Sequence, residues 1–514
     1  MAREFRQMIP AALAAALVAA LVLAPLGAVM LRAGGLSALT PSDLDALWFT
    51  LWQAALSALL SCALAVPVAR ALHRRRFPGR GLFIAALGAP FLLPTIVAVM
   101  GLLAILGRRG LLNGILNALG LPDISLYGPQ GVVVAHVFLN LPLATRMILQ
   151  GWQAIPAERV RLALSLGLPP AQISRHLERP MLRAVLPGAG LAIFLVCLTS
   201  FAVALTLGGG PRASTLEVAI YQAFRFDADL GRAAALSVLQ IALALAALAI
   251  AARITLPSSF GAGLDRALPA RLAPGLGHRL KDGIAILGTG AFLLVPLGAI
   301  ALRGIAELPS LPASVWHAAL TSCLIALGAT AVTLALALPL ALAAPRARWA
   351  EAVAMLPLAA SALVLGTGLF VILRPALPPA SLALPVTLLV NAALSLPFAL
   401  RLLLPEVRTL QADYDRLAGS LGLQGLARLR VLTLPRLARP LGFSAGIAAA
   451  FSMGDLGVIT LFSDGRTQTL PLALYSLMGS YRMDQAAGAA CLLMMLTFGL
   501  YALFDRIGAH ADPR

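Results

Sequence analysis

Uninterrupted apolar runs dominate this chain, and many of them exceed the ~18 residues that an α-helix needs to cross the hydrocarbon layer of a membrane. Hydrophobic residues make up 60% of the 514 positions and charged residues 12%, about half the charged share of an ordinary soluble protein. Lipid offers no hydrogen bonds, so a membrane-spanning segment must pair its own backbone groups, as a helix does. The runs are continuous rather than alternating, which argues against a barrel. We therefore expect an all-α polytopic membrane protein.

The runs predict twelve transmembrane helices, which places both termini on one side of the membrane. The first run follows two arginines but is longer than the apolar core of a signal peptide, so we interpret it as a transmembrane helix. All four cysteines lie inside apolar runs without paired spacing, which favours packing positions over disulfides or metal sites. The predicted helices lie at about 9–31, 47–71, 82–106, 129–150, 184–207, 231–253, 284–303, 314–343, 351–373, 383–404, 441–462 and 485–506.

The net charge of +18 is compatible with a nucleic-acid binder or with a membrane protein of biased topology. With the termini assigned to the cytoplasm, the cytoplasmic segments carry 29 of the 39 Lys and Arg residues and 11 of the 21 acids. The opposite face is then neutral, so the positive-inside rule accounts for the whole excess. Nucleic acid is not needed as a partner. We expect a multi-pass protein of the bacterial inner membrane, embedded in the lipid bilayer, with both termini cytoplasmic.

One stretch of the chain occurs twice, because residues 139–182 and 394–437 are identical at 18 of 44 positions. Six predicted crossings separate the two copies, so both emerge on the cytoplasmic face and the duplication is parallel rather than inverted. Other matches, such as Tyr221 with Tyr475, extend the repeat. We therefore expect two parallel six-helix repeats in one chain.

Changes in composition mark the boundaries of these repeats. Residues 254–283 are rich in Pro, Gly and Ser and carry several arginines, which indicates a cytoplasmic linker too poor in apolar residues for a third domain. The predicted segments are an N-terminal transmembrane helix and periplasmic loop at 1–46, a first transmembrane domain at 47–254, the linker and seventh helix at 255–312, a second transmembrane domain at 313–506 and a cytoplasmic tail at 507–514.

Each copy of the repeated stretch predicts a compact cytoplasmic element. A proline is expected to break the preceding transmembrane helix, because it removes a backbone donor and crowds the preceding turn. A short amphipathic helix, a glycine suited to a helix C-terminus and a second short helix ending at a proline follow. Two short helices joined by a glycine can transmit force to a soluble partner. These features are Pro142, 156–166, Gly167 and Pro180 in the first copy, and Pro397, 411–421, Gly422 and Pro435 in the second.

The spacing of Ala, Gly and Pro in both copies resembles the EAA loop of ABC importer permeases. The resemblance implies the type I importer permease fold, docking of two ATPase subunits on the two loops, and delivery of solute by a periplasmic binding protein. The usual acid of the motif falls on Arg161 and Arg416 here. The alternative is a basic amphipathic loop that only lies on lipid headgroups, which two copies of the same spacing disfavour. The implied ATPase-coupling residues are Glu158, Arg161, Ala163, Gly167 and Pro180, and Asp415, Arg416, Ala418, Gly422 and Pro435.

Several segments resemble one branch of these permeases, the thiamine and thiamine-pyrophosphate importers. They include the runs Ala135 to Arg146, Leu216 to Gln222 and Met453 to Ile459. The resemblance covers nearly the whole chain, including the fusion of two permease units, and implies transport of thiamine or its phosphates. Fused ferric-iron and phosphonate permeases share the fusion and are alternatives. A secondary transporter driven by an ion gradient can also have parallel repeats, but it gives no reason for two matched cytoplasmic loops.

The sequence does not predict an enzyme. A nucleotide-binding P-loop needs Gly-Lys followed by Ser or Thr, and the single lysine, Lys281, stands between Leu280 and Asp282. We find no constellation of nucleophile, metal ligands or paired acids either. We therefore expect no cofactor in this chain and assign ATP and Mg²⁺ to a separate ATPase subunit.

Polar residues inside apolar helices are candidates for a translocation path, because they are costly in lipid unless they face a cavity or another helix. His136 and Asn140 lie on one face of a predicted helix, and the repeat carries them onto Asn391 and Ser395. The hypothesis is that these four residues line a path between the two repeats. The alternative is interhelical hydrogen bonding that only holds the bundle together.

Two acids, Glu217 and Asp455, also lie in apolar segments. Such acids could guide a cationic substrate, for example thiamine with the fixed charge of its thiazolium ring. The alternative is that they are gate or packing residues that pair with Arg212, Arg225 or Arg466.

Overall fold

The computed structural model of the chain describes residues 2–33, 39–210, 213–253, 276–463 and 467–511. These residues form helices joined by turns, without a β-strand among them. In this part of the chain, eleven helices are long and apolar enough to cross a membrane. A further pair, Arg348–Ala359 and Ala362–Leu373, is bent by 93° at a short break and brings the number to twelve if it is counted as one span. The predicted all-α class with about twelve transmembrane helices is confirmed.

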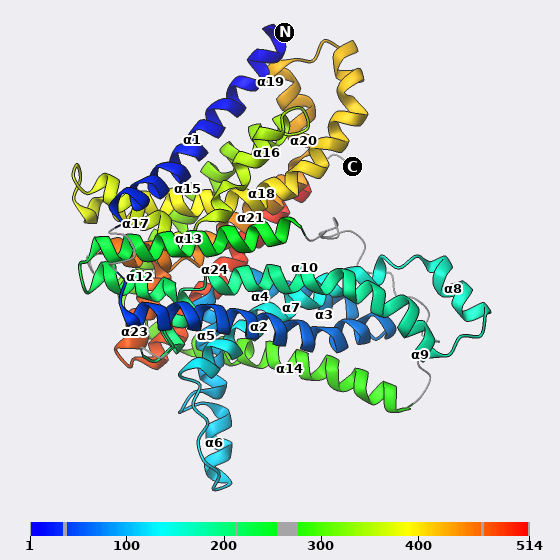
Figure 1. The fold of residues 1–514 in the computed structure, drawn as a ribbon, viewed down its shortest axis with the longest axis vertical. Helices are drawn as coiled ribbons and strands as arrows, with labels where there is room; N and C mark the ends of the chain where they lie inside the picture. The colour runs from blue at the N-terminus through cyan, green and yellow to red at the C-terminus, as the bar shows by residue number, and fades with distance from the viewer. Residues whose placement is uncertain (1, 34–38, 211–212, 254–275, 464–466, 512–514) are drawn as a thin grey trace.

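The two repeats occupy the blue-to-green and green-to-red parts of Figure 1. The first contains α1 (Ala2–Arg32), α2 (Pro41–Arg74), α3 (Arg80–Ala86), α4 (Ala89–Leu92), α5 (Thr95–Leu106), α6 (Leu111–Ala118), α7 (Pro129–Gln153), α8 (Ala157–Ser165), α9 (Pro170–Ile173), α10 (Arg179–Leu198), α11 (Ala202–Leu207), α12 (Leu216–Arg225) and α13 (Leu230–Ala252). The second contains α14 (Leu276–Glu307), α15 (Ala313–Ala343), α16 (Arg348–Met355), α17 (Ala362–Leu373), α18 (Pro379–Ser420), α19 (Gly425–Arg428), α20 (Leu434–Arg436), α21 (Ala438–Met453), α22 (Gly457–Phe462), α23 (Leu470–Gly479) and α24 (Met483–His510).

The first helix of each repeat packs against the other repeat. A Cβ added to Gly368 of α17 would lie 2.3 Å from the carbonyl oxygen of Pro25 in α1, and one added to Gly101 of α5 would lie 3.1 Å from that of Pro296 in α14. Small residues permit such close approach of membrane helices. The two repeats are therefore interlocked, because α1 lies on the second repeat and α14 lies on the first.

The short helices α12 and α23 begin in the same way in both repeats. The Leu216 amide donates to the Thr50 hydroxyl of α2 at 2.9 Å, and the Leu470 amide donates to the Ser322 hydroxyl of α15 at 2.8 Å. The first amides of a helix have no intrahelical acceptor, so each hydroxyl satisfies a buried donor. These equivalent contacts agree with the parallel repeat predicted from the sequence.

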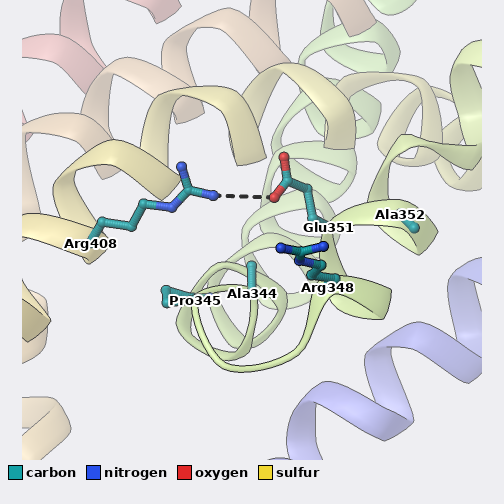
Figure 2. Close-up of a pocket in the computed structure, with 6 residues that line it drawn as sticks. All are labelled: Ala344, Pro345, Arg348, Glu351, Ala352 and Arg408. Atoms are coloured by element: carbon teal, nitrogen blue, oxygen red, sulfur yellow. Dashed lines mark hydrogen bonds and ion pairs between the residues drawn. The ribbon is translucent and has the colours of Figure 1, made fainter. Parts of the chain in front are cut away.

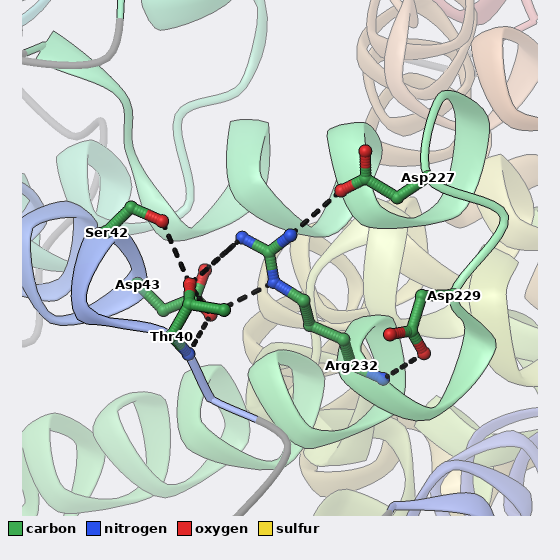
Figure 3. A network of polar contacts seen from close by, with 6 residues as sticks. All are labelled: Thr40, Ser42, Asp43, Asp227, Asp229 and Arg232. Carbon is green, nitrogen blue, oxygen red and sulfur yellow. Dashed lines mark hydrogen bonds and ion pairs between the residues drawn. The ribbon is translucent and has the colours of Figure 1, made fainter.

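A network of ion pairs ties the start of α2 to the start of α13 (Figure 3). Arg232 donates through Nη2 to Oδ1 of Asp43 at 2.7 Å and through Nε to Oδ2 at 3.0 Å, and it pairs with Asp227 at 2.8 Å. Asp43 is 1% exposed and accepts from the Thr40 amide, which completes a capping box. The network fixes the end of the first repeat that lies away from the repeated stretch.

The prolines of the repeated stretch do not break their helices, contrary to the prediction. α7 runs through Pro142, and α18 runs through Pro397, so the predicted helices at 383–404 and 411–421 form one helix of 42 residues. A proline inside a helix removes a single donor, and neighbouring helices in a membrane bundle can compensate for this loss.

Helix breaks occur instead within other predicted spans. The predicted helix 82–106 is divided into α3, α4 and α5, with one break just before Pro94, and the structure extends this span to Ala118 through α6. Proline disfavours the α conformation in the residue before it, which explains that break. The predicted helices at 184–207 and 441–462 are divided similarly. Most of the predicted linker lies outside the described residues, and the domain boundaries stay predictions.

Candidate coupling and translocation sites

The first repeated loop, residues 156–180, protrudes at the right of the molecule in Figure 1. α8 is followed by Gly167 with φ +66°, a left-handed conformation that favours glycine. The Leu168 amide bonds the Ala163 carbonyl at 3.1 Å and closes the turn. The predicted turn is therefore confirmed. The predicted second helix does not end at Pro180, because α9 and a π-helical segment, Ser174–Glu178, lead directly into α10.

The second repeated loop, residues 411–435, protrudes at the top of Figure 1. Gly422 also has φ +66°, and the Leu423 amide bonds the Ala418 carbonyl at 2.9 Å. α19 and a second π-helical segment, Leu429–Thr433, follow the glycine. The two loops thus share one turn geometry, although the second begins as a continuation of α18 without a break in the helix.

The two loops bury and expose equivalent side chains. The alanine four residues before each glycine is buried, Ala163 with 6% and Ala418 with 2% of its surface exposed. Large apolar side chains beside these alanines are exposed in both copies. Exposed apolar area of this kind marks a surface that contacts another molecule. Their exposed fractions are 59% for Leu162 and 53% for its equivalent Leu417, and 66% for Leu166 and 65% for its equivalent Leu421.

The charged residues predicted for ATPase contact lie in two different situations. Glu158, Arg161 and Arg416 are exposed, and within the described part of the chain none of them forms an ion pair. Asp415 instead pairs with Arg346 at 2.7 Å and with Arg428 of α19. The first three are therefore available to a partner, whereas Asp415 holds the second loop together.

An ion-pair cluster that we did not predict holds the first loop. Glu178, 6% exposed, pairs with Arg70 and with Arg74 of α2, each at 2.8 Å. Its neighbour Ser174 lies 3.4 Å from the Arg70 guanidinium. The partners are 104 residues or more apart in sequence, so no local spacing reveals them. The available signal was an acid within a strongly basic stretch.

The predicted path residues of the first repeat form hydrogen bonds between helices. His136 Nε2 lies 2.8 Å from Ser200 Oγ. Asn140 Nδ2 donates to the His136 carbonyl at 2.9 Å and lies 3.4 Å from the sulfur of Cys197. Both residues are buried. These contacts connect α7 to the end of α10 and the residues that follow it.

The equivalent positions of the second repeat are arranged in the same way. Asn391 Nδ2 donates to Ser452 Oγ at 3.1 Å and so connects α18 to α21. Asn391 and Ser395 are 5% and 2% exposed. The contacts in both repeats are those of the bundle-holding alternative, and a role in the translocation path stays a prediction.

Glu217 and Asp455 each have one buried carboxylate oxygen without a hydrogen-bond partner among the described residues. Glu217 is 1% exposed and lies close to Ser361, which belongs to the other repeat. Asp455 accepts from the Gly457 amide at 3.1 Å.

Both acids lie near the break between α16 and α17. Ser361 caps α17, and a Cβ added to Gly457 would lie 3.4 Å from that of Ala362. Of the predicted arginine partners, Arg212 and Arg466 lie outside the described residues, and Arg225 forms no ion pair with either acid. The two carboxylates therefore lie where elements of both repeats meet.

The described part of the chain contains no cluster of metal-ligating side chains and no disulfide. Among its residues no group of three or more His, Cys, Asp or Glu could hold a metal ion. The four cysteines are free, and three of them are buried, which agrees with their assignment as packing residues.

Comparison of the sequence with known proteins identifies its family. Residues 78–257 match the family described as binding-protein-dependent transport system inner membrane component. The chain is 41% identical to the thiamine transport system permease protein of Brucella abortus over 97% of this chain and 94% of that protein. It is 38% identical to the proteins of the same description from Salmonella typhimurium, over 90% of this chain and 89% of the relative, and from Escherichia coli, over 89% and 88%. Because the similarity spans both repeats, the chain belongs to this family of inner-membrane permeases of binding-protein-dependent transport systems.

Proposed function

We propose that the chain forms the channel of an ABC importer that carries thiamine or its phosphates across the inner membrane. Three relatives with 38–41% identity over most of the chain are named thiamine transport system permeases, which supports this substrate class. Ferric-iron and phosphonate permeases share the fused arrangement and are the alternative. The chain itself is a transport subunit, and a partner ATPase binds ATP and Mg²⁺.

The observation that carries the proposal is the pair of matched loops with exposed leucines. Each loop presents an exposed leucine, Leu162 or Leu417, on the helix that ends at a glycine turn with φ +66°. We infer that one ATPase subunit docks on each loop and that ATP-driven closure of the two subunits moves the repeats between inward-open and outward-open states. An ion-gradient transporter would have no use for two such surfaces.

The proposed orientation follows from the charges. The arginine-rich segments beside both loops favour a cytoplasmic location for the loops and the termini. A periplasmic binding protein then delivers its solute at the opposite face, where α12 and α23 lie.

For the path itself, we propose that Glu217 and Asp455 guide a cationic substrate, with His136, Asn140, Asn391 and Ser395 nearer to the loops. A buried carboxylate oxygen without a partner is costly, and two such oxygens near the contact between the repeats favour a function that needs negative charge. Thiamine carries a fixed positive charge on its thiazolium ring and is such a cation.

Reconstitution tests the class of transporter. Proteoliposomes that contain the chain, its ATPase and its binding protein should take up thiamine only with ATP. The double variant Leu162→Glu and Leu417→Glu should reduce uptake about tenfold or more, because a charge placed at the centre of an interface is costly. Leu119→Glu, which changes a similarly exposed leucine directly after α6, is the matched control. Uptake that continues without ATPase, or that stops when only the ion gradient is removed, would contradict the proposal.

Two further measurements test substrate and path. The cognate binding protein should bind thiamine or its phosphates in preference to ferric iron and phosphonates, as measured by calorimetry. Alanine at His136 or Asn391 should change the KM or kcat of uptake in a stably folded protein. Unchanged kinetics would leave these residues with a structural role only.

A further inference from the structure

A cavity of about 570 Å³ lies where α15 ends and α16 begins, with α18 as its opposite wall (Figure 2). This volume is in the range of sites for small ligands. Neither repeat's loop nor the proposed path includes it. It is lined by Ala344, Pro345, Arg348, Glu351, Ala352 and Arg408.

The charged side chains of the cavity leave one cation unneutralised. Arg408 pairs with Glu351 at 3.3 Å from the opposite wall. Arg348 is exposed and forms no hydrogen bond or ion pair within the described part of the chain. The cavity therefore has a net charge of one positive unit and a guanidinium whose donors are available to an anion.

The backbone adds to this preference. α16 starts at Arg348, and its N-cap residue, Ala347, has no side chain that can accept a hydrogen bond from the first turn. The unpaired amides and the positive end of the helix dipole at such a terminus favour an anionic group. The helix terminus and Arg348 thus converge on the same cavity.

The position of the cavity indicates where the anion comes from. The membrane-spanning helix α15 ends at Ala343, directly before the first residues of the cavity, and Trp349 beside it is 40% exposed. Exposed Trp at a helix end is typical of the membrane–water interface, and basic pockets between helices on the cytoplasmic side bind anionic headgroups. We propose that this cavity binds the phosphate of an anionic phospholipid of the adjacent leaflet, which is the cytoplasmic leaflet in the orientation proposed above.

The charged residues of this cavity are only partly repeated in the first half of the chain. The shift that relates Pro67 to Pro339 places Arg76 opposite Arg348, and the shift of the repeated stretch places Gln153 opposite Arg408. The second arginine of the cavity is therefore absent from the first repeat. The bound lipid would lie against α16 and against α18, the helix that carries the second loop, and no equivalent contact is expected for α7.

Native mass spectrometry of the full chain with added phosphatidylglycerol tests the proposal. The wild type should retain phosphatidylglycerol in preference to phosphatidylcholine. Arg348→Ala should weaken this retention by about tenfold, because a hydrogen bond to a charged group is lost, and Glu351→Gln should strengthen it. Arg109→Ala removes an exposed arginine of the same charge far from the cavity and should have no effect.

Several outcomes would overturn the proposal. Equal retention by Arg348→Ala and Arg109→Ala would do so, as would equal retention of the two lipids. Displacement of the lipid by millimolar inorganic phosphate would assign the cavity to a soluble anion. Unchanged lipid retention combined with weaker binding of the ATPase to Arg348→Ala would assign it to a protein contact. If Arg348→Ala fails to fold, the opposite shift expected for Glu351→Gln still decides the question.

Discussion

The two repeated loops share a backbone turn but are fastened to the protein by different ion pairs. In the first loop, Arg74 of α2 pairs with Glu178, which lies after the glycine turn. In the second, the equivalent arginine, Arg346, pairs with Asp415, which lies before the turn. The position of Glu178 is occupied by Thr433 in the second loop. In both repeats an arginine at the end of the second helix, α2 or α15, pairs with an acid of the loop. The acid follows the glycine in the first loop and precedes the glycine in the second.

The two fastenings also differ in exposure. The side chains of Arg74 and Glu178 are each 8% exposed, whereas those of Arg346 and Asp415 are 51% and 30% exposed. A buried charge that loses its partner is strongly destabilising, while exposed pairs contribute little because water screens them. The backbone turn is therefore the element that the two loops share. We expect the Arg74–Glu178 pair to matter for stability and the Arg346–Asp415 pair to matter for transmitting force from the ATPase to the membrane helices.

The largest effect is expected at Glu178. Glu178→Gln removes the anion that Arg70 and Arg74 share and should lower the free energy of unfolding by about 3–5 kcal/mol, because a buried guanidinium is left uncompensated. The measurement is thermal unfolding of the purified chain in detergent. Asp415→Asn is the matched control in the second loop. Equal losses of stability for the two variants would break the comparison between a buried and an exposed fastening.

A second pair of variants tests where the repeats are alike. Thr50→Val and Ser322→Ala each remove the hydroxyl that accepts from the first amide of α12 or α23. Each should cost about 1–3 kcal/mol, because a buried amide loses its acceptor. Thr497→Val is the control, since its hydroxyl donates only to the Leu493 carbonyl within its own helix. A clear difference between Thr50→Val and Ser322→Ala would mean that the two repeats are not equivalent at this end.

The fold class followed from the sequence because the length of apolar runs and the position of arginines act locally. The turns at Gly167 and Gly422 were also predictable, since a left-handed residue after a helix favours glycine. The prediction that the prolines break their helices was wrong. Pro142 and Pro397 are helix breakers by local rules, but the bundle around α7 and α18 overrides them.

The parts of the site that could not be predicted depend on contacts between distant segments. The pairing of Arg74 with Glu178 joins α2 to the first loop, and no spacing along the chain encodes it. The crossing of α1 onto the second repeat has the same origin, because Gly368 and Pro25 are separated by most of the chain. The repeat alignment does not reveal these pairs either, because it places Val160 at the position of Asp415.

The smallest effect on stability, but the most informative one for function, is expected at Asp415. Asp415→Asn breaks two partly exposed pairs, to Arg346 and Arg428, so it should change the free energy of unfolding by no more than about 1 kcal/mol per pair. The second loop would nevertheless lose its connection to the turn after α15, and we expect more ATP hydrolysed per thiamine transported in reconstituted vesicles. Asp415→Glu keeps the charge and should restore the ratio. A normal ratio in Asp415→Asn would show that the second fastening, unlike the glycine turn, has no part in transmitting force.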